Sequence, residues 1–468
     1  MSEPAGISEA LQKLRADGAD GATVAAFEYY VGRLAGGDLG LLGEDQIEPA
    51  RDLPDADDLP RARDDAAELL DQTVLIKLNG GLGTSMGMTQ AKSLLPVKDG
   101  LSFLDVTARQ LLDLRARYSE PGRAPRLPLV LMNSFHTREA SLSALAGYDS
   151  LAADLPPDMV QSRVPKLLDD GSLRPAAGAA DPEHEWAPPG HGDLYTALLA
   201  SGMLAAMLER GYRYAFVSNA DNLGAVLDPA ILGWFADQRA PFLMEVADRT
   251  AADRKGGHLA RRPDGGLLLR EIAQTPADDA EAFQDVERHR YFNTNTIWLD
   301  LRALSELIQR AGFIELPMIV NRKTLDPADP GSPAVIQLET AMGAAIDAFD
   351  GALAIRVPRS RFLPVKTTDD LLVLRSDAYV LDERSRVVLA PQRRGVAPLA
   401  SLDVRYFKLI GDFDARFPTG PPSLVGCDSL TVRGDVSFGS DVTVRGTVTV
   451  EQPGGESLTV ATGTLLQG

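Results

Sequence analysis

A glycine-rich stretch in the first quarter of the chain constrains the fold more than any other feature. An apolar run at 74–78 is typical of a short buried strand, and it leads into a loop with glycines at 80, 81, 83 and 87 before Lys92. Glycine lets backbone N–H groups turn inward and lets phosphate oxygens approach without a Cβ in the way, and the lysine adds a positive charge. The stretch therefore predicts a phosphate-binding loop at the end of a strand.

Neither of the common phosphate-binding motifs fits this loop. A P-loop requires glycine directly before its Lys-Ser/Thr pair, and here Ala91 precedes Lys92 and Ser93. The dinucleotide fingerprint Gly-x-Gly-x-x-Gly also fails, because the last glycine of the loop comes one residue late. On glycine content alone, a turn-rich loop without a ligand is an equal alternative.

The stretch as a whole resembles the signature of the eukaryotic-type UDP-glucose pyrophosphorylases. The shared residues are Leu-Asn-Gly-Gly-Leu-Gly-Thr at 78–84, Met-Gly at 86–87 and Lys92, which lies at the same distance along the chain as the family's lysine. One residue departs from the signature, since Ala91 stands where the family usually has proline. The resemblance implies a GT-A-type, Rossmann-like α/β fold with a mixed sheet, that of the nucleotide-diphospho-sugar transferases. It also assigns UTP contacts to this loop, and glucose 1-phosphate contacts to the two glycines among them; the residues are Leu78, Asn79, Gly80, Gly81 and Lys92.

Length and charge restrict the class of protein. At 468 residues the chain is too long for one compact core and predicts two or three domains. A net charge of −19 argues against a nucleic-acid partner, because phosphate backbones are bound by clustered Lys and Arg. A single nucleotide remains compatible with this charge, since it needs only a few local cations and a metal.

The chain shows no sign of secretion or membrane insertion. Cys427 is the only cysteine, which excludes an intrachain disulfide and a zinc cluster built on several thiolates. The first residues lack a basic segment followed by an apolar core, and the apolar stretch 194–208 is too short to span a bilayer. We therefore expect a cytoplasmic protein without a membrane partner.

Residues 1–70 are expected to form a helical appendage and an acidic connector. Apolar spacing predicts helices over 7–17 and 22–34. Between 44 and 71 there are eleven Asp and Glu residues against three Arg, together with three prolines. This composition favours a solvated connector, and a partner-binding segment is the alternative.

Residues 71–384 are predicted to form the catalytic domain. Strand-like runs at 127–132, 214–218, 242–246 and 296–299 alternate with helix-like runs at 103–116, 195–209 and 303–311. Such alternation favours an α/β layer with a largely parallel sheet, in which ligands lie at the carboxyl ends of the strands.

Residues 385–468 have a different pattern. Apolar residues recur every six positions from Leu424 to Val448, and a second series runs from Val432 to Val450. This period is typical of a parallel β-helix, with a plain antiparallel meander as the alternative. The family resemblance favours a left-handed parallel β-helix. Its unpaired strand edges suggest self-association into a homo-oligomer, and removing this region is expected to disturb assembly or stability more than chemistry.

Asp221 is the candidate metal ligand. It follows the predicted strand at 214–218, within Asn-Ala-Asp-Asn, and Mg²⁺ commonly takes one or two protein carboxylates plus phosphate oxygens. An Asp at a strand end is also a common helix cap. The segment matches the family's Ser/Ala-Asp-Asn-Leu-Gly motif, whose Asp binds the metal, and the resemblance gives Asn219 to the sugar phosphate.

Two further segments match family motifs for the base and the sugar phosphate. Pro-Pro-Gly-His-Gly-Asp at 188–193 implies that Gly190 backs the uracil and that His191 contacts the sugar phosphate, although a lone histidine is more often structural. In Gln-Ser-Arg-Val-Pro at 161–165, the Gln161 amide offers the donor and the acceptor that the uracil edge requires, while a surface turn is the alternative.

The last two motifs concern glucose and the triphosphate. Asn293 and Asn295 supply amides suited to sugar hydroxyls, and the resemblance assigns both to glucose. The segment 357–366 holds three cations, which are either surface charges or, by the resemblance, a means of bringing Lys366 to the triphosphate opposite Lys92.

The reaction implied is UTP + glucose 1-phosphate ⇌ UDP-glucose + pyrophosphate, with Mg²⁺ as cofactor. The attacking phosphate oxygen is already ionised, so neither a general base nor a covalent intermediate is needed, and Lys92, Lys366 and Asp221 are the expected catalytic residues. One alternative is a UTP-dependent enzyme for another sugar 1-phosphate, such as that of galactose or N-acetylglucosamine; Ser-Met-Gly at 85–87 argues against the N-acetylhexosamine branch. The other is a silent nucleotide-binding scaffold.

Overall fold

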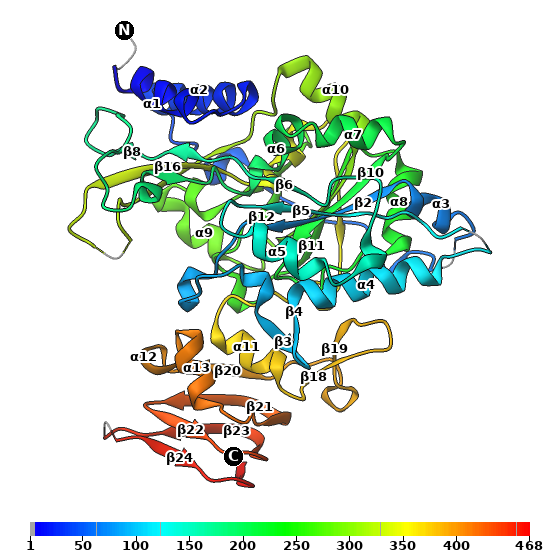
Figure 1. The fold of residues 1–468 in the computed structure, drawn as a ribbon, viewed down its shortest axis with the longest axis vertical. Coiled ribbons are helices and arrows are strands. Elements are labelled where there is room, and N and C mark those ends of the chain that lie inside the picture. The colour runs from blue at the N-terminus through cyan, green and yellow to red at the C-terminus, as the bar shows by residue number, and fades with distance from the viewer. Residues whose placement is uncertain (1–4, 62, 122, 328, 455) are drawn as a thin grey trace.

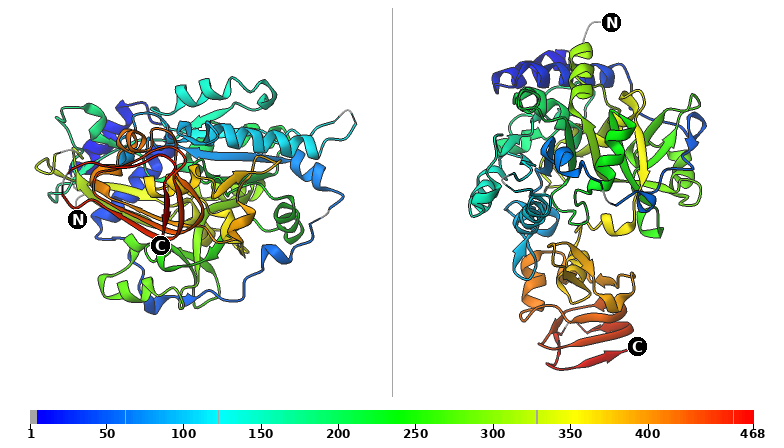
Figure 2. Two further views of the ribbon diagram at one scale, coloured as in Figure 1. Left: turned by 90° about the horizontal axis from the view of Figure 1, so that it is seen from below. Right: turned by 90° about the vertical axis from the view of Figure 1, so that its right-hand side faces the viewer.

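The computed structural model describes residues 5–61, 63–121, 123–327, 329–454 and 456–468. The N-terminal helices lie at one end of the long axis and the C-terminal strands at the other, with an α/β body between them (Figures 1 and 2). Within these residues, no helix is long and apolar enough to cross a membrane.

A ten-stranded mixed sheet forms the centre of the body. Its main path runs in the order β1 (Glu48–Pro49), β12 (His258–Arg261), β14 (Tyr291–Asp300), β10 (Tyr214–Asn219), β2 (Thr73–Asn79), β5 (Leu129–Asn133) and β6 (Asp158–Val160). Off this path lie β11 (Phe242–Asp248), β13 (Leu267–Arg270) and β17 (Leu353–Arg356). The predicted mixed α/β fold is confirmed.

Strand direction divides this sheet into two parts. Strands β10, β2, β5 and β6 run parallel to one another, as the alternating pattern predicts. The expectation of a largely parallel sheet is wrong for β14, which runs antiparallel to β10, β11 and β12. Parallel neighbours are usually joined by a crossover helix, whereas residues 249–290 between β11 and β14 form the hairpin β12–β13, whose first strand joins the sheet beside β14, and one short helix.

Helices cover the body and both ends. They are α1 (Ala5–Ala16), α2 (Gly21–Ala35), α3 (Ala66–Asp71), α4 (Phe103–Arg117), α5 (Arg138–Leu145), α6 (Leu194–Ala200), α7 (Met203–Glu209), α8 (Pro229–Gln238), α9 (Ala280–Gln284), α10 (Leu301–Ala311), α11 (Thr368–Arg375), α12 (Val404–Phe407) and α13 (Ile410–Arg416). The predicted helix over 195–209 is instead two helices, because Gly202 between α6 and α7 adopts a left-handed φ of 70°.

The two faces of the sheet bury separate cores. Side chains alternate along β2, so Val74 and Ile76 pack with α6, α7 and α10, whereas Leu75 packs with α4 and α8. Both faces are therefore covered, which explains why β2 reads as a continuous apolar run.

The N-terminal helices share a core with the body. Leu14 of α1 and Phe27 of α2 belong to one hydrophobic cluster with Val164 and Leu338. Leu338 lies in a smaller sheet of β15 (Met318–Thr324), β16 (Ala334–Thr340) and β8 (Leu167–Leu168). Helices α1 and α2 form where the spacing predicts them, but they are docked on the body and do not project from it.

The acidic connector is not simply solvated. Glu44 accepts hydrogen bonds from Arg270 and Arg288, and Asp55 forms an ion pair with Arg356 at 2.6 Å. Several of its carboxylates thus find arginine partners far away in the sequence, which the local composition cannot reveal.

The C-terminal strands stack in parallel. One sheet consists of β20 (Leu399–Leu402), β21 (Ser423–Arg433), β23 (Thr443–Glu451) and β25 (Leu465–Gln467), and a second consists of β22 (Val436–Phe438) and β24 (Leu458–Val460). The antiparallel meander is therefore excluded. Both six-residue series are buried. Their side chains share one cluster with Val97, Phe103 and Val365 of the preceding region.

Three two-stranded sheets complete the described structure. They are β3 (Pro96–Lys98) with β4 (Leu101–Ser102), β7 (Val164–Pro165) with β9 (Trp186–Ala187), and β18 (Tyr379–Leu381) with β19 (Val387–Leu389).

Candidate active site

A cleft opens at the carboxyl ends of β2 and β10. Loops that follow parallel strands converge at this edge, which is where α/β sheets bind ligands. The cleft is lined by Leu78, Asn79, Gly80, Gly81, Lys92, Ser93, Met132, Gln161, Pro188, Gly190, His191, Asn219, Ala220 and Asp221. It thus brings together ten of the thirteen residues assigned to the site from the sequence. Of the other three, Asn293 and Asn295 lie on β14, and Lys366 lies on a nearby segment.

The glycine loop owes its path to residues without a side chain. Gly83 and Gly87 have left-handed φ values of 70° and 72°. A Cβ on Gly80 would lie only 2.5 Å from the Gln161 side-chain oxygen. The loop and the Gln161 segment are therefore in direct contact across the cleft, which the sequence motifs, 80 residues apart, do not reveal.

Ala91 holds the entrance to Lys92 in a defined conformation. Its φ of −53° and ψ of 126° are values that a proline would also adopt. Alanine at this position therefore has the backbone conformation that the proline expected there would have. The Lys92 N–H donates to the Gly81 oxygen at 3.0 Å. Next to it, the buried Ser93 hydroxyl has no hydrogen-bond partner in the described residues and lies at the cleft.

Lys92 and Asp221 face each other in the cleft. The Lys92 ammonium donates to Asp221 Oδ2 at 2.6 Å, and their side chains are 17% and 25% exposed. A cation and a carboxylate that come from loops after two adjacent parallel strands thus meet at one point. This arrangement suits a ligand that carries both phosphate and a divalent metal.

Asn79 has a buried side chain at the end of β2. Its amide donates to Asn133 Oδ1 at 2.7 Å and to Ser141 Oγ at 2.8 Å, and Asn133 donates in turn to Asp158. Both amide hydrogens of Asn79 are therefore used within the protein. The network ties the ends of β2 and β5 to α5 and to the start of β6 beneath the cleft.

The loop that carries Asp221 is anchored from below by a buried lysine. Lys77 donates to Ser218 Oγ at 2.7 Å and to the Ala225 oxygen at 3.0 Å, and so closes the loop between them. Burial and the nearby Arg361 lower the pKa of Lys77 to about 7. This supporting residue was not predicted, because a lysine inside an apolar strand run carries no motif.

Gly190 and His191 form a turn packed on the end of β16. A Cβ on Gly190 would lie 2.4 Å from the Thr340 oxygen, so no larger residue fits there. His191 Nδ1 accepts the Met342 N–H at 2.9 Å, which leaves the proton of the neutral ring on Nε2. Burial lowers the pKa of His191 to about 4. His191 therefore offers a neutral N–H donor and no positive charge.

Asn293 and Asn295 lie at a β-bulge in β14. The pairing with β11 shifts register between Glu245 and Val246, and Asn295 adopts a left-handed φ of 56°. The Asn293 amide donates to Asn295 Oδ1 at 2.9 Å. The bulge lies beside the end of β10, but neither amide is among the residues that line the cleft.

Lys366 lies on a segment that reaches the Asp221 loop. Pro364 forms an isolated β-bridge with Asn222, and Asn222 Oδ1 accepts the Leu363 N–H at 2.8 Å. Lys366 itself is exposed, with its ammonium 5.7 Å from the centre of the Phe362 ring. The structure thus brings this lysine near the Asp221 loop without placing it among the residues that line the cleft.

The interpretation of the cations at 357–366 as surface charges does not hold for Arg361. Its guanidinium makes two hydrogen bonds of 2.7 Å to Glu245, whose side chain is fully buried. Trp298 Nε1 also donates to Glu245, at 2.9 Å. The segment before Lys366 is therefore fixed to β11 by a buried ion pair.

The donor set at Asp221 fits a hard divalent cation. No group of three or more His, Cys, Asp or Glu side chains in the described residues forms a ready metal cage. Mg²⁺ needs no such cage, because it commonly binds one or two carboxylates and takes its other ligands from water and phosphate. The partly exposed Asp221 carboxylate at the cleft meets this requirement.

Comparison with known proteins identifies the family. The family model described as UTP–glucose-1-phosphate uridylyltransferase matches residues 40–445. A curated protein of that name from Solanum tuberosum is 40% identical over 443 residues, covering 93% of this chain and 90% of its own length. Its namesake from Saccharomyces cerevisiae is 41% identical, covering 85% and 77%.

Solved structures agree over the whole chain. A variant of the UDP-glucose pyrophosphorylase from Leishmania major, crystallised with UDP-glucose, superposes with a TM-score of 0.91 at 43% identity, covering 100% of this chain and 99% of that one. A structure named UDP-glucose phosphorylase from Trypanosoma brucei gives 0.89 at 43% identity, with coverage of 99% and 98%. All three comparisons match most or all of this chain, and its separate motifs meet in one cleft. The chain therefore belongs to the UTP–glucose-1-phosphate uridylyltransferase family.

Proposed function

We propose that the protein transfers the uridylyl group of UTP to glucose 1-phosphate, forming UDP-glucose and pyrophosphate. One observation carries the proposal: four motifs from distant parts of the chain, at 78–92, 161, 190–191 and 219–221, line a single cleft. Membership of the family supports the same reaction.

The nucleotide is proposed to lie across the glycine loop and the Gln161 segment. The Gln161 amide would read the donor and acceptor of the uracil edge, with Gly190 behind the base. Phosphate oxygens would meet the backbone around Gly80 and Gly81, together with Lys92. The unpartnered Ser93 hydroxyl is a further donor for this ligand.

Glucose 1-phosphate is proposed to bind beside the nucleotide. His191 would donate from Nε2 to the sugar phosphate as a neutral ring. Asn219 lines the same cleft, and Asn293 and Asn295 would contact the sugar hydroxyls from the bulge in β14.

The transfer is proposed to be a single in-line displacement. An ionised oxygen of glucose 1-phosphate forms a bond to the α-phosphorus of UTP, the bond from that phosphorus to the bridging oxygen breaks, and pyrophosphate leaves with the electron pair. Asp221 would hold Mg²⁺, which neutralises charge on the phosphates when bound. Lys92 and Lys366 would stabilise the charge that shifts during transfer, without a general base.

An assay of product formation tests the reaction. Purified protein with UTP, Mg²⁺ and a panel of sugar 1-phosphates, those of glucose, galactose and N-acetylglucosamine, should give UDP-glucose as the preferred product. Equal use of ATP or dTTP, or a preference for another sugar, would refute the assignment. Failure to release pyrophosphate with any of them would favour a silent scaffold.

The C-terminal strands are proposed to form a left-handed parallel β-helix on a GT-A-type catalytic domain. Leu430 pairs with Val448 in the neighbouring parallel strand, 18 residues or three six-residue periods later. This spacing and the burial of both series support a coil in which each turn contains three six-residue periods. We also propose self-association through the exposed end strand β25, and a cytoplasmic location in keeping with one buried, unpaired cysteine.

A further inference from the structure

The segment that carries Gln161 is held on its far side by the N-terminal helices. Gln161 itself is bonded to the body, since its N–H donates to the Asn133 oxygen at 2.7 Å. The next two residues, Ser162 and Arg163, turn away from the cleft. Both meet residues of the first 35, which carry no recognisable motif.

Ser162 connects α2 with the start of α6. Its hydroxyl lies 3.0 Å from Thr23 Oγ1, and its N–H donates to Asp193 Oδ2 at 2.5 Å. The Thr23 hydroxyl donates to Asp20, the residue that caps α2, at 2.5 Å. Because the hydrogen of Thr23 is used there, its oxygen is free to accept from Ser162.

Arg163 is held by Asp17, the residue that follows α1, and by Glu183, whose carboxylate accepts from the same guanidinium at 3.0 Å. Its guanidinium makes two hydrogen bonds to the Asp17 carboxylate, at 2.6 and 2.8 Å. It also lies over the rings of Phe135 and Trp186, at 5.1 and 4.8 Å from their centres. A bidentate, stacked arginine holds its backbone in one place better than a single flexible contact does.

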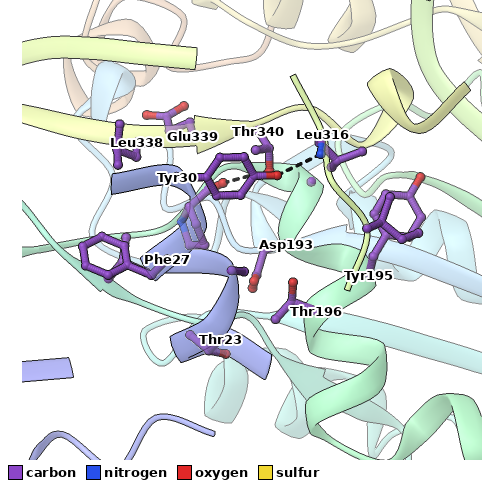
Figure 3. Close-up of a pocket in the computed structure, with 15 residues that line it drawn as sticks. Thr23, Phe27, Tyr30, Asp193, Tyr195, Thr196, Leu316, Leu338, Glu339 and Thr340 are labelled. Atoms are coloured by element: carbon purple, nitrogen blue, oxygen red, sulfur yellow. Dashed lines mark hydrogen bonds between the residues drawn. The ribbon is translucent and has the colours of Figure 1, made fainter. Parts of the chain in front are cut away.

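Helix α2 also closes a cavity behind this region. The cavity lies between α2, the start of α6 and the end of β16, and Figure 3 shows Thr23 and Tyr30 on one side with Asp193 on the other. Tyr30 accepts the Leu316 N–H at 2.9 Å. Helix α2 thus contacts the Gln161 segment through Thr23, whereas Tyr30 binds a part of the body away from that segment.

We propose that Asp17 and Thr23 are positioning residues for the nucleobase. By holding Ser162 and Arg163, they fix the backbone that presents the Gln161 amide to the cleft. Gln161 discriminates bases only if its donor and acceptor are held in register with the base edge, because cytosine reverses the pattern of uracil. The inference rests on the proposed function, in which Gln161 contacts the base.

The test is base selectivity in Asp17→Asn and Thr23→Val. We expect the ratio of kcat/KM for UTP to that for CTP to fall about tenfold in each, since one well-placed hydrogen bond is at stake. The KM for UTP should rise, while kcat and the KM for glucose 1-phosphate stay within about twofold of the unchanged protein. Thr23→Ser, which keeps the hydroxyl, should restore selectivity.

Two control variants separate positioning from docking of the helices. Tyr30→Phe removes the hydrogen bond between α2 and Leu316 but leaves the contacts of α2 with the Gln161 segment unchanged. Glu28→Gln alters only an exposed contact with Arg15, at 3.8 Å. Both should keep the selectivity ratio, and thermal unfolding should confirm that all variants are folded. If Tyr30→Phe lost selectivity as much as Thr23→Val, or if neither Asp17→Asn nor Thr23→Val lost any, the inference would be overturned.

Equilibrium titration with UTP and CTP distinguishes this inference from the reaction itself. If the unchanged protein binds UTP in preference to CTP but makes no UDP-glucose, the proposed reaction fails and the positioning role is still decided by the binding ratio in the variants. If the unchanged protein shows no preference for UTP, the proposed reaction and the positioning role are both refuted.

Discussion

The buried ion pair between Arg361 and Glu245 yields a quantitative prediction. The Glu245 side chain is 0% exposed and that of Arg361 is 11% exposed, so Arg361→Met would strand a buried carboxylate with one remaining donor, Trp298 Nε1. Removing one partner of a buried pair costs about 3–5 kcal/mol. This is a large share of the roughly 5–15 kcal/mol that stabilises a typical domain.

The same segment supplies a matched control. Arg359, two residues earlier, is 41% exposed and forms an ion pair with Asp253 at 2.8 Å. Arg359→Met should cost less than about 1 kcal/mol, because solvent screens such pairs. The double variant Arg361→Met/Glu245→Gln should recover most of the loss, since it removes the stranded charge.

Urea unfolding followed by fluorescence measures these differences, and kcat tests their consequence for the site. The Arg361 oxygen accepts the Asn222 amide at 3.3 Å, so the pair also fixes the approach to Lys366. We expect kcat to fall in Arg361→Met and not in Arg359→Met. Equal stability of the two single variants would refute the reasoning that the Arg361 pair is buried and structural.

Three further predictions concern charged and titratable groups. Lys366→Ala should lower kcat by about a hundredfold with little change in KM, because a cation beside the shifting charge acts mainly in the transition state; steady-state kinetics with near-normal turnover would remove Lys366 from the mechanism. Asp221→Asn should abolish Mg²⁺-dependent turnover while the circular dichroism spectrum is unchanged, and activity that still responds to Mg²⁺ would contradict the assignment. Burial, reinforced by His289, lowers the pKa of His258 well below its usual value, so below about pH 6.5 the unfolded chain binds a proton that the folded chain does not. Stability should therefore fall by up to about 1.4 kcal/mol per pH unit from this group as the pH drops, and His258→Phe should flatten that slope in urea unfolding between pH 5 and 7.

Contiguous patterns in the sequence predicted the parts of the protein that depend on local chemistry. The apolar run of β2, the glycines whose left-handed φ values shape the loop, and the buried six-residue series all carry their structural reason in neighbouring residues. The same holds for the cleft residues at 78–92, 161 and 219–221, because they lie at or after the carboxyl ends of β2, β6 and β10 at one edge of the sheet. Gly190 and His191 instead follow β9 of a separate two-stranded sheet.

Features that depend on a distant partner were not predictable in this way. Arg361 and Arg359 look alike in the sequence, yet one is buried and the other exposed, because Glu245 lies 116 residues from the first. The direction of β14 was missed because a strand pattern records which face is buried and not which way the chain runs. Asp17 and Thr23 likewise gain meaning only from contacts with Arg163 and Ser162.

The cleft is held from both ends of the chain, and this bears on the expectation that the C-terminal region serves only assembly and stability. A Cβ on Gly87 would lie 3.0 Å from Leu409 Cδ2, so a residue between α12 and α13 packs directly on the glycine loop. Loops rich in glycine have few side chains of their own to order them, and therefore depend on what packs against them. Removing the chain from about residue 385 would take away Leu409 as well as the strands beyond it. We therefore expect truncation near residue 385 to lower turnover as well as stability in steady-state kinetics and urea unfolding, because the glycine loop would lose its contact with Leu409.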